Sequence, residues 1–210
     1  MIKIQPFCIG SGETNSYVIY SSNDKEAFIV DAPDGNEVLL SFIKQNTLNV
    51  KAVLLTHGHF DHILGLGKII KAYPKAQIFL DGNDFDFVKD GARRNKAILP
   101  ASYISHFSNE FESLPDELID YPGNVGPFDV IRTPGHTMGS VCLYNKEEKI
   151  LFSGDTLFQG GIGRHDLGGN YDSLLESLEK LKVLDDDTIV FPGHGNSTKI
   201  GFEKETNPYL

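Results

Sequence analysis

The chain has 210 residues with 29 acidic and 19 basic side chains, so its formal net charge is −10. At this length a hydrophobic core forms without disulfides, and a hydrophobic share of 40% indicates a folded rather than a disordered chain. The acidic surplus argues against nucleic acid as the main partner, because phosphate binding normally uses a basic stripe and the only adjacent basic pair is Arg93-Arg94. We predict one domain over residues 1–210.

Cysteine usage and apolar segments bear on the compartment. The two cysteines, Cys8 and Cys142, lie far apart among apolar neighbours, so we expect small buried side chains rather than a disulfide framework. Residues 1–6 contain no apolar stretch of signal-peptide length, and no apolar run is long enough to span a membrane. These features predict a cytoplasmic protein, with neither nucleic acid nor a membrane as its partner.

The first half of the chain is predicted to begin as an antiparallel meander and then to alternate strand and helix. The meander is indicated by alternating apolar residues around a turn at 22–24, and the helices by apolar residues at helical spacing. The expected elements are strands at 2–9, 14–20 and 27–31, a helix at 38–43, a strand at 52–55, a helical stripe at 63–70, a strand at 77–80 and a helix from 83 to 88.

The second half regains regular periodicity after an irregular stretch. Prolines and a glycine interrupt residues 91–126, so loops and short edge strands are expected there. Alternating strands and helices in both halves favour a layered α/β arrangement. The expected elements are strands at 128–131, 140–144 and 149–152, a helix at 171–184, a strand at 188–191 and a helix at 197–206.

The hexapeptide His57-Gly58-His59-Phe60-Asp61-His62 contains four side chains of metal-ligand type. It follows an apolar strand, and in an extended segment His57 and His59 point to the same side. Asp61 and His62 then lie where the chain enters a helix and can face the same space. This spacing suits one metal ion at His57 and His59 and a second at Asp61 and His62.

Three further side chains of ligand type follow apolar strands and lie beside glycine, namely His136, Asp155 and His194. Side chains at the ends of several strands converge on one edge of a sheet, where open α/β folds place their sites. Imidazole and carboxylate without cysteine suit zinc, iron or manganese in an open site that activates water. The alternative is a structural metal, which would close its coordination shell, usually with cysteine.

Two histidines and a glycine-rich segment stand apart from this set. His106 has the surroundings of an ordinary surface or core histidine, whereas His165 lies in the glycine-rich segment 156–169 and could support the site. That segment does not match a Walker loop, since no Gly-Lys-Ser/Thr ends it. Arg164 within it either binds an anionic group of the substrate or anchors the site, or it forms a surface ion pair with Asp166.

The sequence resembles the metallo-β-lactamase superfamily, whose hallmark is the His-x-His-x-Asp-His motif found at 57–62. The resemblance covers nearly the whole chain and is nearest to the short glyoxalase II-like hydrolases, also in the closing Asn-Pro-Tyr-Leu. The other segments that carry it are Thr-Pro-Gly-His-Thr at 133–137, Ser-Gly-Asp-Thr-Leu-Phe at 153–158, Gly-Arg-x-Asp at 163–166 and Pro-Gly-His-Gly at 192–195.

The resemblance implies a four-layer αββα sandwich with a dimetal site. It assigns the first metal to His57, His59 and His136, the second to Asp61, His62 and His194, and a bridging role to Asp155. It further implies zinc, with iron or manganese as alternatives and one site empty in some relatives. Metal-bound hydroxide, oriented by Asp61 as catalytic residue, would attack a thioester such as S-lactoylglutathione, and Arg164 would contact the substrate.

The sequence also departs from some members of the family. Glyoxalase II carries a helical C-terminal domain that binds glutathione, whereas only 16 residues follow His194 here, so residues 91–126 are expected to supply part of the substrate wall. Flavodiiron proteins have Glu where His59 stands, many β-lactamases have cysteine at Asp155, and RNA-processing members add an RNA-binding region. The alternatives that stay open are a mononuclear iron persulfide dioxygenase, which shares the Gly-Arg-x-Asp segment, and a hydrolase of another ester or lactone.

Overall fold

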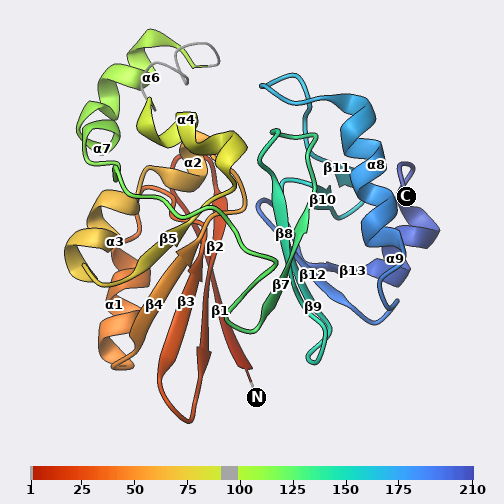
Figure 1. Cartoon of the computed structure of the whole chain (residues 1–210), viewed down its shortest axis with the longest axis horizontal. Helices are drawn as coiled ribbons and strands as arrows, with labels where there is room; N and C mark the ends of the chain where they lie inside the picture. The colour runs from red at the N-terminus through yellow and green to blue at the C-terminus, as the bar shows by residue number, and fades with distance from the viewer. Residues whose placement is uncertain (1, 91–98) are drawn as a thin grey trace. The chain divides into compact units, whose positions relative to one another are not determined.

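Two β-sheets, each with its own helices, form two units of the chain (Figure 1). The computed structural model describes residues 2–90 and 99–210. Unit 1 consists of Met1–Leu80 and Phe85–Ile119, and unit 2 of Asp81–Asp84 and Asp120–Leu210. The single domain over 1–210 stays a prediction.

Unit 1 contains a five-stranded sheet in the order β1-β2-β3-β4-β5, as labelled in Figure 1. The first three strands are antiparallel, and β3, β4 and β5 run parallel to one another. The strands are β1 (Ile2–Ile9), β2 (Thr14–Ser21), β3 (Glu26–Val30), β4 (Asn49–Leu54) and β5 (Gln77–Phe79). The helices are α1 (Glu37–Gln45), α2 (Phe60–Ile63), α3 (Leu66–Ala72), α4 (Phe85–Lys89), α6 (Ala101–His106) and α7 (Ser108–Glu112).

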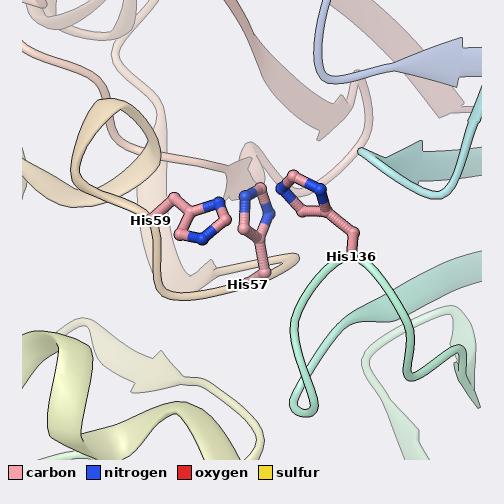
Figure 2. A group of neighbouring side chains, drawn as sticks. All are labelled: His57, His59 and His136. Carbon is pink, nitrogen blue, oxygen red and sulfur yellow. The ribbon is translucent and has the colours of Figure 1, made fainter. Parts of the chain in front are cut away.

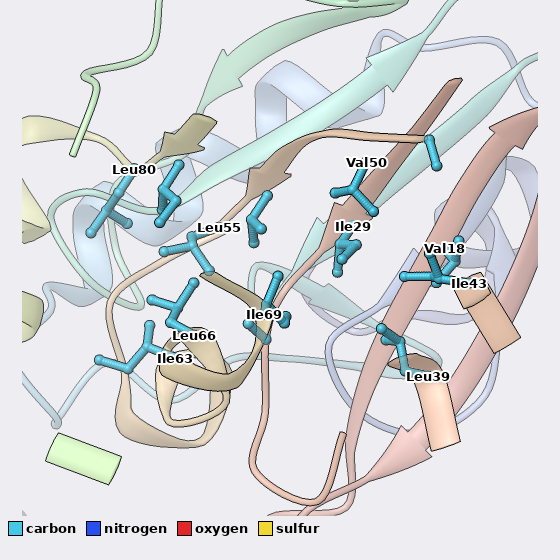
Figure 3. Close-up of a cluster of buried hydrophobic side chains, with 14 of the residues drawn as sticks. Val18, Ile29, Leu39, Ile43, Val50, Leu55, Ile63, Leu66, Ile69 and Leu80 are labelled. Carbon is cyan, nitrogen blue, oxygen red and sulfur yellow. The ribbon is translucent and has the colours of Figure 1, made fainter. Parts of the chain in front are cut away.

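The core of unit 1 lies between one face of this sheet and helices α1 and α3 (Figure 3). Leu39 and Ile43 of α1 and Ile69 of α3 are fully buried against Ile29 and Val53 of the sheet. These helices are therefore held by the apolar stripe that the sequence spacing indicates. The core fixes the position of β4, from whose end the His57–His62 segment departs.

Unit 2 contains a six-stranded sheet in the order β13-β12-β9-β8-β7-β6 and a two-stranded hairpin, β10-β11. Only β12 and β9 pair in parallel in this sheet. Residues of β8, β9 and β12 form its core with Leu178 and Leu181 of α8 and Ile200 of α9. The elements are β6 (Asn124–Val125), β7 (Phe128–Arg132), β8 (Val141–Asn145), β9 (Ile150–Gly154), β10 (Leu157–Phe158), β11 (Gly161–Ile162), α8 (Tyr171–Lys182), β12 (Ile189–Pro192), β13 (Thr198–Lys199) and α9 (Ile200–Thr206), with a 3-10 helix at Gly82–Asp84.

The predicted elements outside residues 91–126 correspond to strands and helices of the structure with two exceptions. The helix expected at 197–206 begins only at Ile200, after β13 at Thr198–Lys199, and the helical stripe at 63–70 is divided between α2 and α3. Gly65 lies at this break because a Cβ there would come within 2.0 Å of the Pro33 carbonyl oxygen. Cys142 is buried as predicted, whereas the prediction for Cys8 is wrong, because it is exposed on β1, the edge strand of its sheet.

The prediction of loops and short edge strands for residues 91–126 is only partly correct. The edge strand β6 is present, but residues 101–112 form α6 and α7. Pro100 begins α6 instead of breaking it, since proline fits the start of a helix. Ile104, Phe107 and Phe111 then pack against Leu64. Residues 91–98, with Arg93-Arg94, lie outside the described residues.

Within residues 2–90 and 99–210, the helices are too short or too polar to cross a lipid bilayer.

Candidate metal centre

The His57–His62 segment follows β4 and carries four predicted ligands of unit 1, of which Figure 2 shows His57 and His59. His59 is extended, with φ −65° and ψ 148°, and precedes α2, which carries Asp61 and His62. The centroids of the His57 and His59 imidazole rings lie 4.8 Å apart, and those of the His57 and His62 rings lie 4.1 Å apart. All four side chains are buried. The segment thus brings its donors together as its spacing predicts.

Asp31 orients two of these histidines. It follows β3, and because β3 and β4 are parallel neighbours it lies beside Thr56. Its carboxylate accepts the Thr56 N–H at 2.8 Å, the Thr56 hydroxyl at 2.9 Å and the His62 Nδ1–H at 2.8 Å. Thr56 Oγ1 lies 3.1 Å from His57 Nδ1 in turn. A carboxylate that accepts from Nδ1 leaves the lone pair on Nε2, the arrangement that metal-binding histidines use.

Asp61 is held from the start of β2 and the loop that precedes it. The Thr14 hydroxyl donates to Asp61 Oδ2 at 3.2 Å. Gly12 allows this loop to come close, because a Cβ there would lie 2.9 Å from the Asp61 Cβ. His62 Nε2 lies 3.7 Å from the same oxygen, Oδ2.

Unit 2 brings together the other three predicted ligands from separate loops. His136 lies between β7 and β8 (Figure 2), Asp155 follows β9, and His194 follows β12. The parallel pairing of β9 with β12 places the ends of these two strands side by side, and Gly193 N–H donates to Gly154 O at 2.8 Å. Asp155 Oδ2 lies 3.6 Å from His136 Nε2 and 3.5 Å from His194 Nε2.

These donor sets fit a divalent metal. Around a tetrahedral ion with bonds of about 2.0–2.1 Å, neighbouring donor atoms lie about 3.3 Å apart. The Nε2–Oδ2 separations, 3.5 and 3.6 Å in unit 2 and 3.7 Å in unit 1, are longer than strong ionic hydrogen bonds and near this value. Imidazole and carboxylate are donor types that could hold zinc, iron or manganese.

The loop that carries His136 is fixed by the Arg164 backbone and by Asp84, of which the sequence had indicated only Arg164. His136 Nδ1 lies 2.6 Å from the Arg164 carbonyl oxygen, which accepts its proton. The buried Asp84 carboxylate accepts the Thr137 hydroxyl at 2.6 Å and the Gly139 N–H at 2.9 Å. No sequence signal marked Asp84, whereas Asp31 follows an apolar strand just as Asp155 does and could have been found.

The glycine-rich segment packs its backbone against the ligand loops. A Cβ at Gly163 would lie 1.8 Å from the Asp155 carbonyl oxygen, and one at Gly169 would lie 1.9 Å from the Gly135 carbonyl oxygen. Glycine is therefore required because two stretches of backbone meet there. This contact anchors the loops of Asp155 and His136.

The Arg164 guanidinium forms an ion pair with Asp166. Its Nε and Nη2 atoms donate to the two carboxylate oxygens at 2.9 and 2.7 Å. This contact lowers the pKa of Asp166 to about 2. Arg164 also lines a cavity of about 560 Å³ in unit 2, with Gly160–Gly163, His165, Asp166, Tyr171 and Tyr209.

The histidines outside the predicted ligand set have other neighbours. The centroid of the His106 ring lies 4.7 Å from that of the Phe107 ring, and the centroid of the His165 ring lies 4.9 Å from that of the Tyr171 ring. The structure therefore groups His57, His59, Asp61 and His62 in unit 1, and His136, Asp155 and His194 in unit 2.

Known proteins resemble the chain over nearly its whole length. The family model described as "Metallo-beta-lactamase superfamily" matches residues 9–194. The probable metallo-hydrolase YqgX of Bacillus subtilis is 36% identical over 96% of this chain and 94% of its own length. The hydroxyacylglutathione hydrolase GloC of Haemophilus influenzae is 35% identical over 90% of this chain and 89% of its own length.

Solved structures agree with this resemblance. The crystal structure of TTHA1623 in a di-iron-bound form has a TM-score of 0.84 and 30% identity, and it covers 98% of this chain and 100% of its own. The crystal structure of the BLEG-1 B3 metallo-β-lactamase has a TM-score of 0.79 and 34% identity, and it covers 100% of this chain and 99% of its own. The predicted α/β sandwich class is thereby confirmed.

Proposed function

The chain belongs to the metallo-β-lactamase superfamily of metal-dependent hydrolases, and from this premise we propose that it cleaves thioesters such as S-lactoylglutathione. The observation that carries the proposal is a complete set of imidazole and carboxylate donors, with Asp155 rather than cysteine between His136 and His194. The similarity to a hydroxyacylglutathione hydrolase supports the thioester as the substrate class.

We assign one metal ion to His57, His59 and His136 and a second to Asp61, His62 and His194, with Asp155 shared. When bound, such ions supply Lewis acidity and lower the pKa of water, which provides a nucleophile at neutral pH. Zinc is the proposed metal, and the di-iron form of a similar protein makes iron the principal alternative. Manganese would also suit these donors, and the chain could work with one ion.

The chain's own residues hold these groups in position. Asp31 and the Arg164 carbonyl fix the rings of His62 and His136 by accepting their Nδ1 protons. Asp61, held by Thr14, orients the attacking water as the catalytic carboxylate. Such fixed hydrogen bonds hold the donors near productive geometry before substrate arrives.

The proposed partner is a small thioester, with no role for nucleic acid or a membrane. The cavity beside Arg164, about 560 Å³, has the size of a small-molecule site. Arg164 would contact an anionic group of the substrate by exchanging its Asp166 partner for that group.

Persulfide oxidation at a mononuclear iron is the second candidate. It would use His57, His136 and Asp155, and it is favoured by the Gly-Arg-x-Asp segment and by iron in a similar structure. A third candidate, hydrolysis of another ester or a lactone, would use the same candidate metal centre as thioester hydrolysis.

The experiment compares substrates at known metal content. The purified protein is analysed for metals, loaded with zinc, iron or manganese, and assayed on S-lactoylglutathione, a panel of acyl thioesters, a lactone and a β-lactam. Oxygen uptake on glutathione persulfide is measured in parallel. We expect metal-dependent thioester hydrolysis, reduced at least ~100-fold in His59→Ala and unchanged in His106→Ala, whose ring contacts Phe107 instead. Absence of thioester turnover with every metal would overturn the proposal, and oxygen uptake on the persulfide would replace it with the second candidate.

A further inference from the structure

A buried carboxylate lies on the C-terminal helix of unit 2, outside the candidate ligand set. Glu203 of α9 has no exposed surface. Its Oε2 accepts the Gly160 N–H at 2.8 Å and the Asn207 Nδ2–H at 2.8 Å, and its Oε1 accepts the Thr198 hydroxyl at 2.5 Å. A buried charge is tolerated only with such hydrogen bonds. Glu203 therefore joins the two flanks of its own helix, at Thr198 and Asn207, to Gly160, which is 43 residues away in sequence.

The segment joined most closely is the β10-β11 hairpin. Gly160 lies in its turn, and Asn207 Nδ2 also donates to Gly161 O at 3.1 Å and Phe158 O at 3.4 Å. Glu203 and Asn207 thus hold the hairpin on both sides of its turn.

The hairpin and the two residues that follow it in turn contact the loops of all three candidate ligands of unit 2. It begins two residues after Asp155, and Gly163 directly after it lies against the Asp155 carbonyl oxygen. The carbonyl oxygen of the next residue, Arg164, accepts the His136 Nδ1 proton. The Phe158 ring contacts the His194 ring at 6.2 Å between centroids.

We propose that Glu203 is a positioning residue for the metal ligands of unit 2, acting through the β10-β11 hairpin that it holds with Asn207. The C-terminal helix then controls how long the metal ions assigned to His136, Asp155 and His194 are retained. This inference rests on the proposed metal centre but not on the substrate. A purely structural role for Glu203 would change stability without changing the rate of metal loss selectively.

The test measures zinc release from the holoenzyme to an excess of a chromogenic chelator. In Glu203→Gln the side chain loses its charge and turns an NH2 group toward one of its present donors. We expect at least one equivalent of zinc to leave ~10-fold faster, the lower end of the effect seen when groups supporting a metal ligand are changed. We expect Asn207→Ala to accelerate zinc release to the same extent. Glu205 is exposed on the same helix, and Glu205→Gln should release zinc at the wild-type rate.

Thr198→Val separates positioning from stability, because Thr198 donates to Glu203 but does not belong to the hairpin. We expect it to lower the melting temperature while leaving zinc release within twofold of wild type. The inference would be overturned if both Glu203→Gln and Asn207→Ala released zinc at the wild-type rate. It would also be overturned if Thr198→Val accelerated zinc release as much as these two variants do. If Glu203→Gln does not fold, Asn207→Ala and Thr198→Val decide. A protein that retains zinc but cleaves no thioester would contradict the proposed substrate and leave this test intact.

Discussion

The two units present their candidate metal-ligand side chains in opposite ways. In unit 1, four candidate ligands come from one hexapeptide, and a side chain, Asp31, orients two of the histidines directly or through Thr56. In unit 2, three candidate ligands come from three loops, and backbone contacts such as Gly163 against Asp155 hold them. Unit 1 should therefore be sensitive to loss of one polar group, and unit 2 to loss of space between backbone segments.

The largest effect is expected from Gly163→Ala in unit 2. The added methyl group would lie 1.8 Å from the Asp155 carbonyl oxygen, so one of the two backbone segments must move. We expect a loss of roughly 3 kcal/mol in the free energy of unfolding together with loss of bound metal. Urea unfolding and metal analysis measure the two effects.

Gly161→Ala is the matched control for this change. Gly161 lies two residues away and does not have a positive φ, and a Cβ added there would meet no atom within 4 Å. We expect wild-type metal content and stability. Equal losses in both variants would show that the segment is sensitive to any substitution and would contradict the close-contact explanation.

Asp31→Asn tests unit 1 and should act on metal affinity more than on stability. The amide has one acceptor oxygen, whereas the carboxylate accepts from both Thr56 and His62. An NH2 group would face one of these donors, so the His62 ring would lose its fixed orientation. We expect metal affinity to fall ~10- to 100-fold, measured by competition with a chelator. Asp34→Asn is the control, since Asp34 accepts from Ser11 instead; equal affinity in both variants would contradict the role of Asp31.

Asp84→Asn should have a smaller effect, confined to the His136 loop. Asp84 accepts from Thr137 and Gly139, and the amide can satisfy only one of them fully. We expect a loss of about 1–3 kcal/mol in the free energy of unfolding. Amide hydrogen exchange should be faster at Gly139, and Asp86→Asn, which is exposed, should leave both measurements unchanged. Unchanged exchange at Gly139 would contradict the contact.

The same comparison explains which parts could be predicted from sequence. The clustering of the hexapeptide side chains, and the strands before His136, Asp155 and His194, were predictable because local spacing and apolar runs encode them. Helices α6 and α7 were not, since each is short and is stabilised by packing of Ile104, Phe107 and Phe111 on Leu64. The contacts of Asp84 with Thr137 and of Glu203 with Gly160 were not predictable either, because these partners lie 53 and 43 residues away.

The smallest expected effect concerns the exposed Arg164–Asp166 pair of unit 2. Arg164 lowers the pKa of Asp166 from 3.8 to about 2. The pair therefore favours the folded state above the ordinary aspartate pKa, and this contribution is lost as the pH falls from about 4 toward 2. Because both side chains are exposed, solvent screens the pair and stability at neutral pH should change little in Arg164→Gln.

The pKa of Asp166 itself should rise toward 3.8 in Arg164→Gln, as followed by NMR titration of its carboxyl carbon. Asp185, whose pKa is lowered by Lys149, should not change and serves as the internal reference. The same measurement tests the proposed substrate contact. If Arg164 leaves Asp166 to bind an anionic group, a saturating thioether analogue of the substrate should also raise the Asp166 pKa in the wild-type protein. A bound analogue that leaves this pKa at about 2 would show that Arg164 stays with Asp166 and serves unit 2 only through its backbone carbonyl.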